Sequence, residues 1–517
     1  MSITHIRPSG PAAFLVEVDS LPEVLALHAF LTAEDPAGLV DAVCAARTVL
    51  VRAASPAYAR RIAALVAHAD LTAPVDLDHT EVSVDVVYDG ADLDEVAALT
   101  GMSRDAVIAA HIGQEWTAAF GGFAPGFVYC IGQDSSLNVP RRATPRTSVP
   151  AGSVGLAGHF SGVYPRSSPG GWQLIGHTGD QMWDPTRAQP ALIAPGNRVR
   201  YRAVRHALTV RSLSPVPTTA TAGLLVRRAG LQSLLEDDGR PGYAALGVTE
   251  SGALDRAAAH RANRLVGNPV GAVVVESLMG GLTVTAQGDQ VLAVTGAAAP
   301  VEVEQPDGAP GVRRYPVRRE TPFALLDGAT VSIGTPERGM RTYLAARGGF
   351  DAPTVLGSAS RDLLSEEGPA PLAAGSVLAV RPAPWPSTVG APAFAPPLPG
   401  SDVTVRVVLG PRDDWFTPQE VAAFLERAWT VTERSNRIGL RLDGRPVARL
   451  VTGELASEGT VAGSIQIPAD GKPVLFLRDH PVTGGYPVIA VAAAEELDVL
   501  AQVVPGTRLH FVPLEKG

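Results

Sequence analysis

The first 80 residues alternate between two hydrophobic patterns. Residues 13–18 and 47–52 are short, mostly apolar runs, which are typical of buried strands. Residues 21–32 and 57–69 instead carry apolar side chains at helical spacing. Strands and helices that alternate in this way bury their apolar faces by packing helices on a sheet. The pattern therefore predicts a small α/β domain over residues 1–80.

Residues 81–205 have the pattern of a β-barrel or β-sandwich. Residues 80–88 alternate between apolar and polar and predict one clear strand. Two short helices are expected at 93–99 and 103–112, the second capped by Ser103. Between 116 and 201, short apolar stretches separated by Gly and Pro are typical of strands joined by tight turns.

Two Pro-rich stretches divide the rest of the chain. Residues 206–222 predict a linker, and residues 382–399 mark a second boundary. The part between them, assigned to 223–400, is rich in predicted strands and has one helix at 253–266, for which Ser251 is a candidate cap. Residues 401–517 predict a last β-rich unit. Mainly β structure behind an α/β domain is the expected fold class.

Composition and charge exclude several classes of protein. A chain of 517 residues needs more than one core. Its net charge of −9 argues against nucleic acid as a partner. No apolar run reaches the ~18 residues that span a membrane, and the first residues lack the pattern of a secretory signal; we expect a cytoplasmic protein. Cys44 and Cys130 are too few for a disulfide framework or a thiolate metal site.

One pair of small motifs occurs twice. The first copy is Ala-Gly-Ser at 151–153 with Ser-Pro-Gly-Gly-Trp at 168–172, and the second is Ala-Gly-Ser at 462–464 with Thr-Gly-Gly-Tyr at 483–486. Each leads into an apolar stretch. Repetition of this kind predicts two similar barrels in which 151–176 and 462–491 are equivalent. Glycines beside hydroxyl and aromatic residues suit a small-molecule site; the alternative is that both are tight turns without a ligand.

Candidate chemistry comes from charged loops. Arg141 and Arg146 lie in a Pro-rich loop, where guanidinium groups could bind a carboxylate or phosphate, or could be ordinary surface arginines. Asp479 and His480, just before the second Gly-Gly pair, are the best acid/base candidates. The chain lacks a lysine P-loop and the Met-Lys-Met seat of a biotin carrier. No residue can be assigned as a metal ligand from the sequence.

Several strings resemble the 5-oxoprolinase/urea amidolyase family. The first half is similar to allophanate hydrolase subunit 1, also called KipI-like or the B subunit of 5-oxoprolinase, through Gly-Phe-Ala-Pro-Gly-Phe-Val-Tyr at 122–129 and the first motif copy. The second half is similar to allophanate hydrolase subunit 2, the KipA-like, biotin-dependent carboxyltransferase family or the C subunit of 5-oxoprolinase, through Gly-Ala-Leu-Asp at 252–255, Ser-Asn-Arg-Ile-Gly at 435–439 and the second copy. The chain resembles a fusion of both.

The resemblance implies a fold and an activity. It implies cyclophilin-like β-barrels, one in the first half and two related ones in the second. The implied activity is ATP-dependent opening of 5-oxoproline to glutamate, shared with a LamB/YcsF-type subunit, with ATP and Mg²⁺ as expected ligands and no bound biotin. A carboxyltransferase or allophanate hydrolase component of urea metabolism, and an inhibitor of a sensor histidine kinase, are the alternatives. The chain is expected to hydrolyse little 5-oxoproline without the LamB/YcsF-type subunit. Assembly into a homo-oligomer is left as an open alternative.

The two Gly-Gly turns, each facing an Ala-Gly-Ser loop, predict two pockets, one in each half of the chain. In the first, Arg146 is assigned a catalytic role; the binding residues are Arg141, Ser153, Tyr164, Ser168, Gly170, Gly171 and Trp172. In the second, Asp479 and His480 are the catalytic candidates and Arg437 is placed near the rim; the other binding residues are Ser464, Gln466, Thr483, Gly484, Gly485 and Tyr486.

Overall fold

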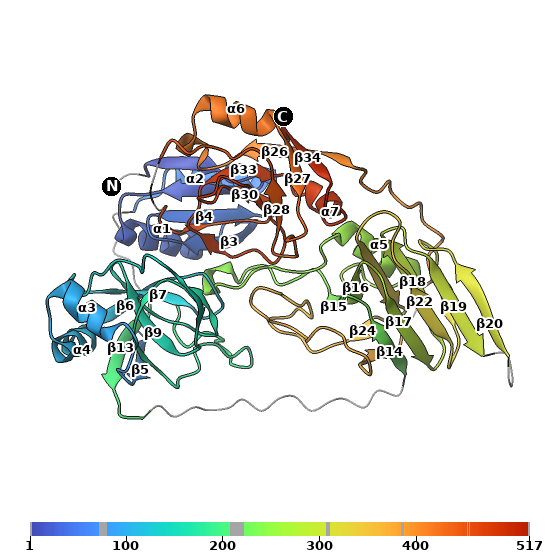
Figure 1. Ribbon diagram of the computed structural model, residues 1–517, viewed down its shortest axis with the longest axis horizontal. Coiled ribbons are helices and arrows are strands. Elements are labelled where there is room, and N and C mark those ends of the chain that lie inside the picture. Colours follow the sequence, from blue (N-terminus) through green and yellow to red (C-terminus); the bar gives the residue numbers. More distant parts are fainter. Residues whose placement is uncertain are drawn as a thin grey trace.

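The computed structural model describes residues 3–71, 80–206, 222–306, 311–383, 387–451, 453 and 455–514. They form four units, arranged so that the N-terminal unit and the last unit lie together above the other two in Figure 1. The expected fold class, mainly β with an α/β N-terminal part, is confirmed. All but the ends of the predicted linker 206–222 lies outside the described residues.

The N-terminal unit is a four-stranded antiparallel sheet covered by two helices on one face. Its strands, in the order β1-β2-β4-β3, and its helices are β1 His5–Pro8, β2 Ala13–Glu17, β3 Leu39–Cys44, β4 Thr48–Ala53, α1 Leu21–Glu34 and α2 Pro56–Val66. Ser20 and Glu23 form a capping box at the start of α1. Alternate strand residues such as Val16 and Val49 pack under the helices. The opposite face is therefore free to meet another unit.

The second unit, in residues 80–206, is a barrel of seven strands in the order β12-β9-β10-β7-β6-β13-β5. Its elements are β5 Glu81–Val86, α3 Leu93–Thr100, α4 Arg104–Gly113, β6 Trp116–Gly121, β7 Val128–Gly132, β8 Arg146–Val149, β9 Ser153–Ala157, β10 Phe160–Val163, β11 Ser168–Gly170, β12 Gln173–His177 and β13 Arg198–Ala203. A single bridge between Val87 and His177 joins its two edge strands. The helix cap at Ser103 is as expected.

The last unit repeats this topology. It is a closed barrel in the order β33-β30-β31-β28-β27-β34-β26, with the strand pair β29-β32 in the place of β8-β11. Its elements are β26 Asp402–Leu409, η2 Asp413–Trp415, α6 Pro418–Glu426, β27 Ala428–Val431, β28 Gly439–Asp443, β29 Glu458–Gly459, β30 Ser464–Gln466, β31 Val474–Phe476, β32 Thr483–Gly484, β33 Val488–Ala492, α7 Glu496–Leu500 and β34 Arg508–Pro513.

The two barrels correspond strand by strand. In each, the first and last strands pair in parallel, β5 with β13 and β26 with β34. Ser153 begins β9 and Ser464 begins β30, and each of these strands pairs with the strand after the Gly-Gly turn. The segments 151–176 and 462–491 thus occupy equivalent places, as the repeated motifs predict.

Residues 222–383 form two sheets that enclose one core. Seven strands pair as β20-β19-β22-β17-β14-β25-β24 and five as β15-β16-β23-β18-β21, an order unlike that of the two barrels. The barrel expected for this part is instead a pair of packed sheets. The chain leaves the seven-stranded sheet after β14, turns at Gly230 and enters the five-stranded sheet with β15. The elements are β14 Gly223–Ala229, β15 Gln232–Glu236, η1 Ala244–Leu246, α5 Arg256–Val266, β16 Val274–Leu278, β17 Leu282–Gln287, β18 Gln290–Gly296, β19 Val301–Pro306, β20 Val312–Val317, β21 Phe323–Leu325, β22 Thr330–Ile333, β23 Arg341–Ala346, β24 Phe350–Asp351 and β25 Val377–Val380.

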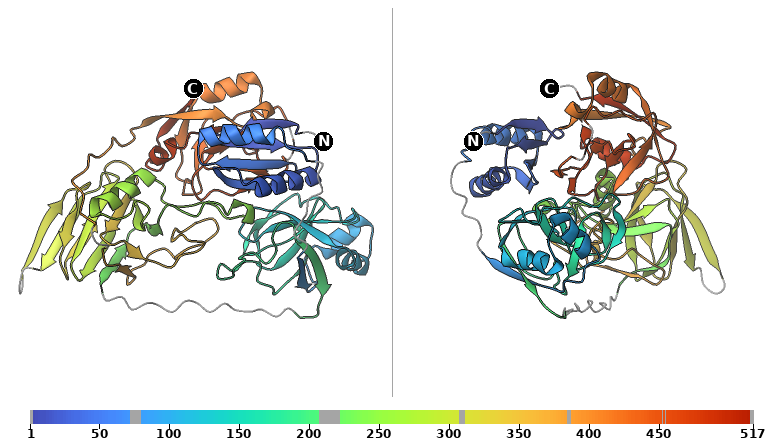
Figure 2. Two further views of the ribbon diagram at one scale, coloured as in Figure 1. Left: turned by 180° about the vertical axis from the view of Figure 1, so that it is seen from behind. Right: turned by 60° about the vertical axis from the view of Figure 1, so that its left-hand side comes forward.

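The free face of the N-terminal sheet packs on the last barrel. Leu15, Val43 and Leu50 form one apolar cluster with Val482 of that barrel. Figure 2 shows the two units side by side, with η1 of the third unit reaching beneath them. An ion cluster closes the edge of this interface: Arg412 binds both Glu458 of its own unit and Glu17 of β2.

We expect Arg412→Met to destabilise the protein by about 3–5 kcal/mol, because it leaves the buried carboxylate of Glu458 without a cation, whereas Glu17 keeps its ion pair with Arg7. Chemical unfolding of the whole chain measures this effect. Arg406→Met is the matched control, since Arg406 also pairs with a glutamate but its side chain is 50% exposed. Equal stability of the two variants would show that the Arg412 cluster does not hold the interface.

Candidate functional site

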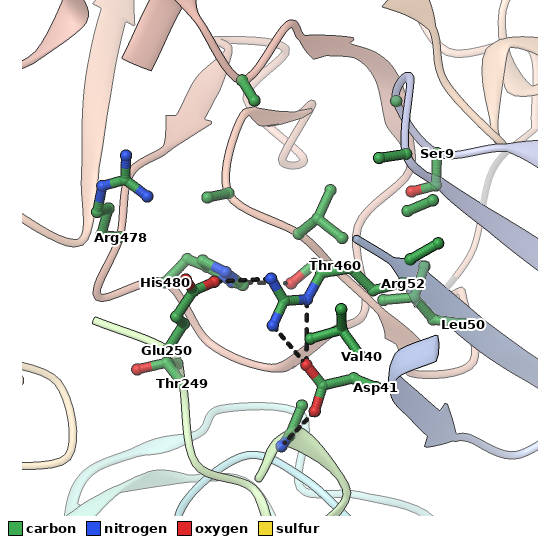
Figure 3. Close-up of a pocket in the computed structure, with 18 of the residues that line it drawn as sticks. Ser9, Val40, Asp41, Leu50, Arg52, Thr249, Glu250, Thr460, Arg478 and His480 are labelled. Carbon is green, nitrogen blue, oxygen red and sulfur yellow. Dashed lines mark hydrogen bonds and ion pairs between the residues drawn. The ribbon is translucent and has the colours of Figure 1, made fainter. Parts of the chain in front are cut away.

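A cavity of about 420 Å³ lies where three units meet. The outer face of the N-terminal sheet forms one wall, residues 240–256 of the third unit form the second, and the last barrel forms the third. Figure 3 shows polar side chains from all three walls pointing toward one another. A volume in this range suits a small molecule.

Glu250 is the charged centre of the cavity. Its carboxylate accepts a 2.7 Å hydrogen bond from Arg52 Nη1 of β4 and a 2.6 Å bond from Arg256 Nη2. Arg52 also binds Asp41 of β3, with Nη2 2.6 Å from Oδ2. Burial opposes the charge on Glu250, but Arg256, Arg52 and Arg478 outweigh it and lower its pKa to about 2. The carboxylate is therefore ionised at neutral pH and joins the two halves of the chain.

Arg478 is a cation with spare hydrogen-bonding capacity. Its Nη2 lies 3.8 Å from Asp498, and its Nε lies 3.5 Å from the carbonyl oxygen of Leu254, so both contacts are long. Burial and the nearby positive charge of Arg256 lower its pKa to about 10, so it stays protonated at neutral pH. A buried guanidinium with weak partners, close to a second arginine, favours an entering anion.

His480 borders the same cavity. Its Nδ1 is 2.9 Å from the carbonyl oxygen of Pro481, which can only accept, so Nδ1 carries the proton and Nε2 is the acceptor. Burial lowers the pKa of His480 to about 4, so the ring is neutral at pH 7. This placement keeps His480 as a candidate proton acceptor, as the sequence predicts.

Asp479, the other acid/base candidate, points away from the cavity. It is fully buried, and Arg437 donates to it from Nε at 2.9 Å and from Nη2 at 3.1 Å. The hydroxyl of Ser251 and the backbone N–H of Leu363 also donate to it. A carboxylate with these partners is an anchor, and the geometry does not support a role as proton carrier.

Arg437 does not lie near a rim. Its side chain is 1% exposed and binds Glu276 at 2.6 Å in addition to Asp479, and Glu236 lies 3.3 Å away. The expected place at a rim is wrong, because the third unit covers this face of the barrel. Glu236 is fully buried, and neither of its oxygens makes a well-formed hydrogen bond. Burial therefore raises the pKa of Glu236 well above its ordinary value.

The remaining second-copy residues make structural contacts outside the cavity. Thr483 Oγ1 accepts a 3.1 Å bond from the backbone N–H of Phe123 in the first barrel. A Cβ at Gly122 would lie only 2.7 Å from that oxygen, so the close approach requires glycine. Gln466 donates to the carbonyl of Tyr486, and Ser464 accepts from the backbone of Val461. Tyr486 itself is 47% exposed. Gly484 and Gly485 form the turn between Thr483 and Tyr486.

The first motif copy also forms a tight turn away from this cavity. Arg146 donates to Asp92 at 2.7 Å, so its charge is already paired. A Cβ at Gly170 would lie 2.3 Å from Tyr164 Oη, which explains that glycine. Trp172 packs on Phe127 and Tyr129. Ser153 is buried in β9, and Ser168 Oγ is buried without a hydrogen-bond partner. Gly171 continues the turn after Gly170, and the side chain of Arg141 is exposed to solvent. The expected pockets on the Gly-Gly turns thus do not coincide with the cavity, and binding roles for these residues stay predictions.

Comparisons with known proteins match both halves of the chain. Residues 4–193 match the family "Carboxyltransferase domain, subdomain C and D", and residues 246–513 match "Carboxyltransferase domain, subdomain A and B". The chain is 34% identical to the 5-oxoprolinase C subunit of Escherichia coli over 292 residues, which is 56% of this chain and 90% of that protein. The chain belongs to the 5-oxoprolinase/urea amidolyase family.

Family members divide these parts differently. A stretch of 123 residues, 23% of this chain, is 49% identical to the 5-oxoprolinase B subunit of Escherichia coli and spans 56% of that protein. Urea amidolyase of Lachancea kluyveri is 32% identical over 56% of this chain, which spans only 17% of that protein. The crystal structure of TTHA0988 superimposes with a TM-score of 0.84 at 33% identity, covering 98% of this chain and 100% of that one.

This family member therefore joins two parts in one chain, as the sequence predicts. Residues 4–193 are called the B-like part and residues 246–513 the C-like part, after the two family matches and the B and C subunits of 5-oxoprolinase among the relatives.

The described residues contain no helix that is long and apolar enough to cross a membrane. They also contain no group of three or more His, Cys, Asp or Glu side chains arranged to hold a metal ion.

The buried carboxyl of Glu236 predicts a pH effect on stability. Because its folded pKa lies above its unfolded value, the folded state keeps a proton that the unfolded state loses, so stability falls as pH rises through this window. Glu236→Gln, which mimics the protonated acid, removes that loss. The stability gain of the variant should grow as the pH rises above the unfolded pKa of a glutamate, by at most about 1.4 kcal/mol per pH unit. Thermal unfolding at several pH values measures it, and a constant difference would contradict a raised pKa of Glu236.

Proposed function

We propose that this chain is a component of an ATP-dependent 5-oxoprolinase, in which it supplies the substrate-activation step and acts with a LamB/YcsF-type subunit. The observation that carries the proposal is the composite cavity. Arg52 comes from the B-like part, whereas Glu250, Arg256 and Arg478 come from the C-like part. Relatives of these two parts are separate proteins, named as the B and C subunits of 5-oxoprolinase, and here residues of both parts line one cavity.

The charges of the cavity suit a small anionic lactam. Arg478 would hold the carboxylate of 5-oxoproline, and neutral His480 would accept a proton through Nε2. A lactam carbonyl resists attack by water, because nitrogen donates electrons to it and is a poor leaving group. Transfer of a phosphoryl group from ATP to the carbonyl oxygen makes the carbonyl carbon more electrophilic toward water, and arginines stabilise the charge on the phosphoryl group in transfer. After water adds, the C–N bond breaks as the nitrogen leaves with a proton, and hydrolysis of the resulting acyl phosphate releases phosphate and glutamate.

The residues of the cavity offer more to phosphate than to a metal ion. Arg478 has only long contacts, and Arg256 Nε is buried without a hydrogen-bond partner, whereas the carboxylates of Glu250 and Asp41 are both bound to arginine. Phosphate contacts are therefore assigned to the arginines, and we assign Mg²⁺ to none of the described side chains.

Carboxyl transfer is the second candidate function. The matched family carries the carboxyltransferase description, and urea amidolyases are among the relatives. The same anion seat would suit a carboxylated carrier, but the Met-Lys-Met seat for biotin is missing from this chain, so a separate biotin carrier would have to bring the carboxyl group.

The assay that separates the two functions uses the purified full chain with a purified LamB/YcsF-type subunit. We expect glutamate release from 5-oxoproline that depends on ATP and on both proteins, and little release by either protein alone. Failure of this mixture, together with ATP-dependent carboxylation of urea in the presence of a biotin carboxylase and its biotin carrier, would replace the proposal by the carboxyl-transfer function.

Loss of Arg478 should weaken the site selectively. We expect Arg478→Ala to lower kcat/KM for 5-oxoproline in the reconstituted mixture by about 30- to 1000-fold, which corresponds to about 2–4 kcal/mol of charge-assisted binding. Arg441→Ala, an exposed arginine on β28 of the same barrel, is the control and should keep normal activity. Near-normal activity of Arg478→Ala would show that the cavity is not the substrate site.

A further inference from the structure

The loop that carries Glu250 has an unusual backbone. Ser251 has φ +54° and Gly252 has φ +95°, and Ser251 is fully buried. A residue with a side chain seldom adopts this left-handed conformation, so the surroundings must hold it. The sequence-based prediction that Ser251 caps α5 is wrong, because Asp255 takes that position and accepts from the N–H of Ala258. The hydroxyl of Ser251 is thus available for another task.

The Ser251 hydroxyl instead bonds to the buried ion pair between Arg437 and Asp479. Ser251 Oγ donates to Asp479 Oδ1 at 2.7 Å, and Arg437 Nη2 donates to the carbonyl oxygen of Gly252 at 2.8 Å. Arg437 and Asp479 are bound to each other, and both side chains are at most 1% exposed. Two consecutive residues of the loop are therefore attached to one ion pair that solvent does not reach.

Asp479 is also placed between two cavity residues in the chain. Arg478 and His480 border the cavity on either side of it, while its own carboxylate points to the opposite side. Glu250 immediately precedes Ser251 and holds Arg52 and Arg256. The position of Asp479 thus determines where Arg478 lies relative to the carboxylate of Glu250 in the facing wall.

We propose that Ser251, Asp479 and Arg437 are positioning residues that hold Glu250, and through it Arg52 and Arg256, in the geometry that receives an anion. The inference rests on the proposed function only for the identity of the substrate. It requires that an anion binds in the cavity. Ser251 borders the cavity, but its hydroxyl is bonded to Asp479, so none of the three residues is assigned a contact with that anion.

Because the anion could be a phosphoryl group or a carboxylate, the test uses inorganic phosphate and 5-oxoproline as separate probes. Both are titrated calorimetrically into the full chain. Ser251→Ala removes the hydroxyl and keeps the strained backbone, whereas Ser251→Gly removes both the hydroxyl and the strain. Each variant should bind the anion roughly tenfold more weakly than the wild type, since each loses the tether. Ser233→Ala, which removes a fully buried hydroxyl on β15 away from the cavity, should bind normally.

A double-mutant cycle separates positioning from a general loss of packing. If Ser251 acts through Glu250, then Ser251→Ala should change anion affinity less than about twofold in a Glu250→Gln background. A purely structural effect would instead be the same in both backgrounds. Circular dichroism and thermal unfolding confirm that each variant is folded.

The outcomes are distinct. Normal anion binding by Ser251→Ala, normal binding by Ser251→Gly, or an undiminished effect of Ser251→Ala in the Glu250→Gln background overturns the positioning role. Binding of phosphate but not of 5-oxoproline by the wild type, with phosphate binding sensitive to Ser251, supports positioning and removes 5-oxoproline as the substrate. Binding of neither probe by the wild type overturns both proposals.

Discussion

The ion pair between Arg437 and Asp479 is the interaction on which the site depends. A guanidinium and a carboxylate that are both removed from water are tolerated only when every remaining donor and acceptor finds a partner. The third unit supplies these partners, namely Glu276 of β16, the N–H of Leu363 and the hydroxyl of Ser251, all around two residues of the last barrel. Relative placement of the third unit and the last barrel is thereby fixed where the cavity begins.

The ion pair between Arg52 and Glu250 extends this arrangement to the N-terminal unit. Relatives of the two parts are separate chains, so in those proteins the equivalent contact would have to form between subunits. Covalent connection raises the local concentration of one part near the other, which favours a composite site without adding any contact. The apolar cluster around Leu50 and Val482 and the Arg412 cluster then align the two parts.

The sequence was sufficient for features that are local or repeated. Helical and strand periods predict the α/β domain, and the repeated Ala-Gly-Ser and Gly-Gly motifs predict the equivalence of β9 with β30, because each signal lies within a short window. The cavity had no such signal: Arg52, Glu250 and Arg478 come from three units, and only the packing of those units brings them together. The prediction for Asp479 fails for the same reason, since its burial depends on a loop more than 100 residues away. His480 lies at the cavity, and its role as a proton acceptor stays a prediction.

In the proposed mechanism the substrate binds in the cavity between the two parts and at neither Gly-Gly turn. A crystal structure of the full chain with 5-oxoproline would locate the ligand. We expect electron density for the ligand in the cavity, with its carboxylate within hydrogen-bond distance of Arg478 and its ring near His480. Density at the 168–172 or 483–486 turn, with an empty cavity, would contradict it.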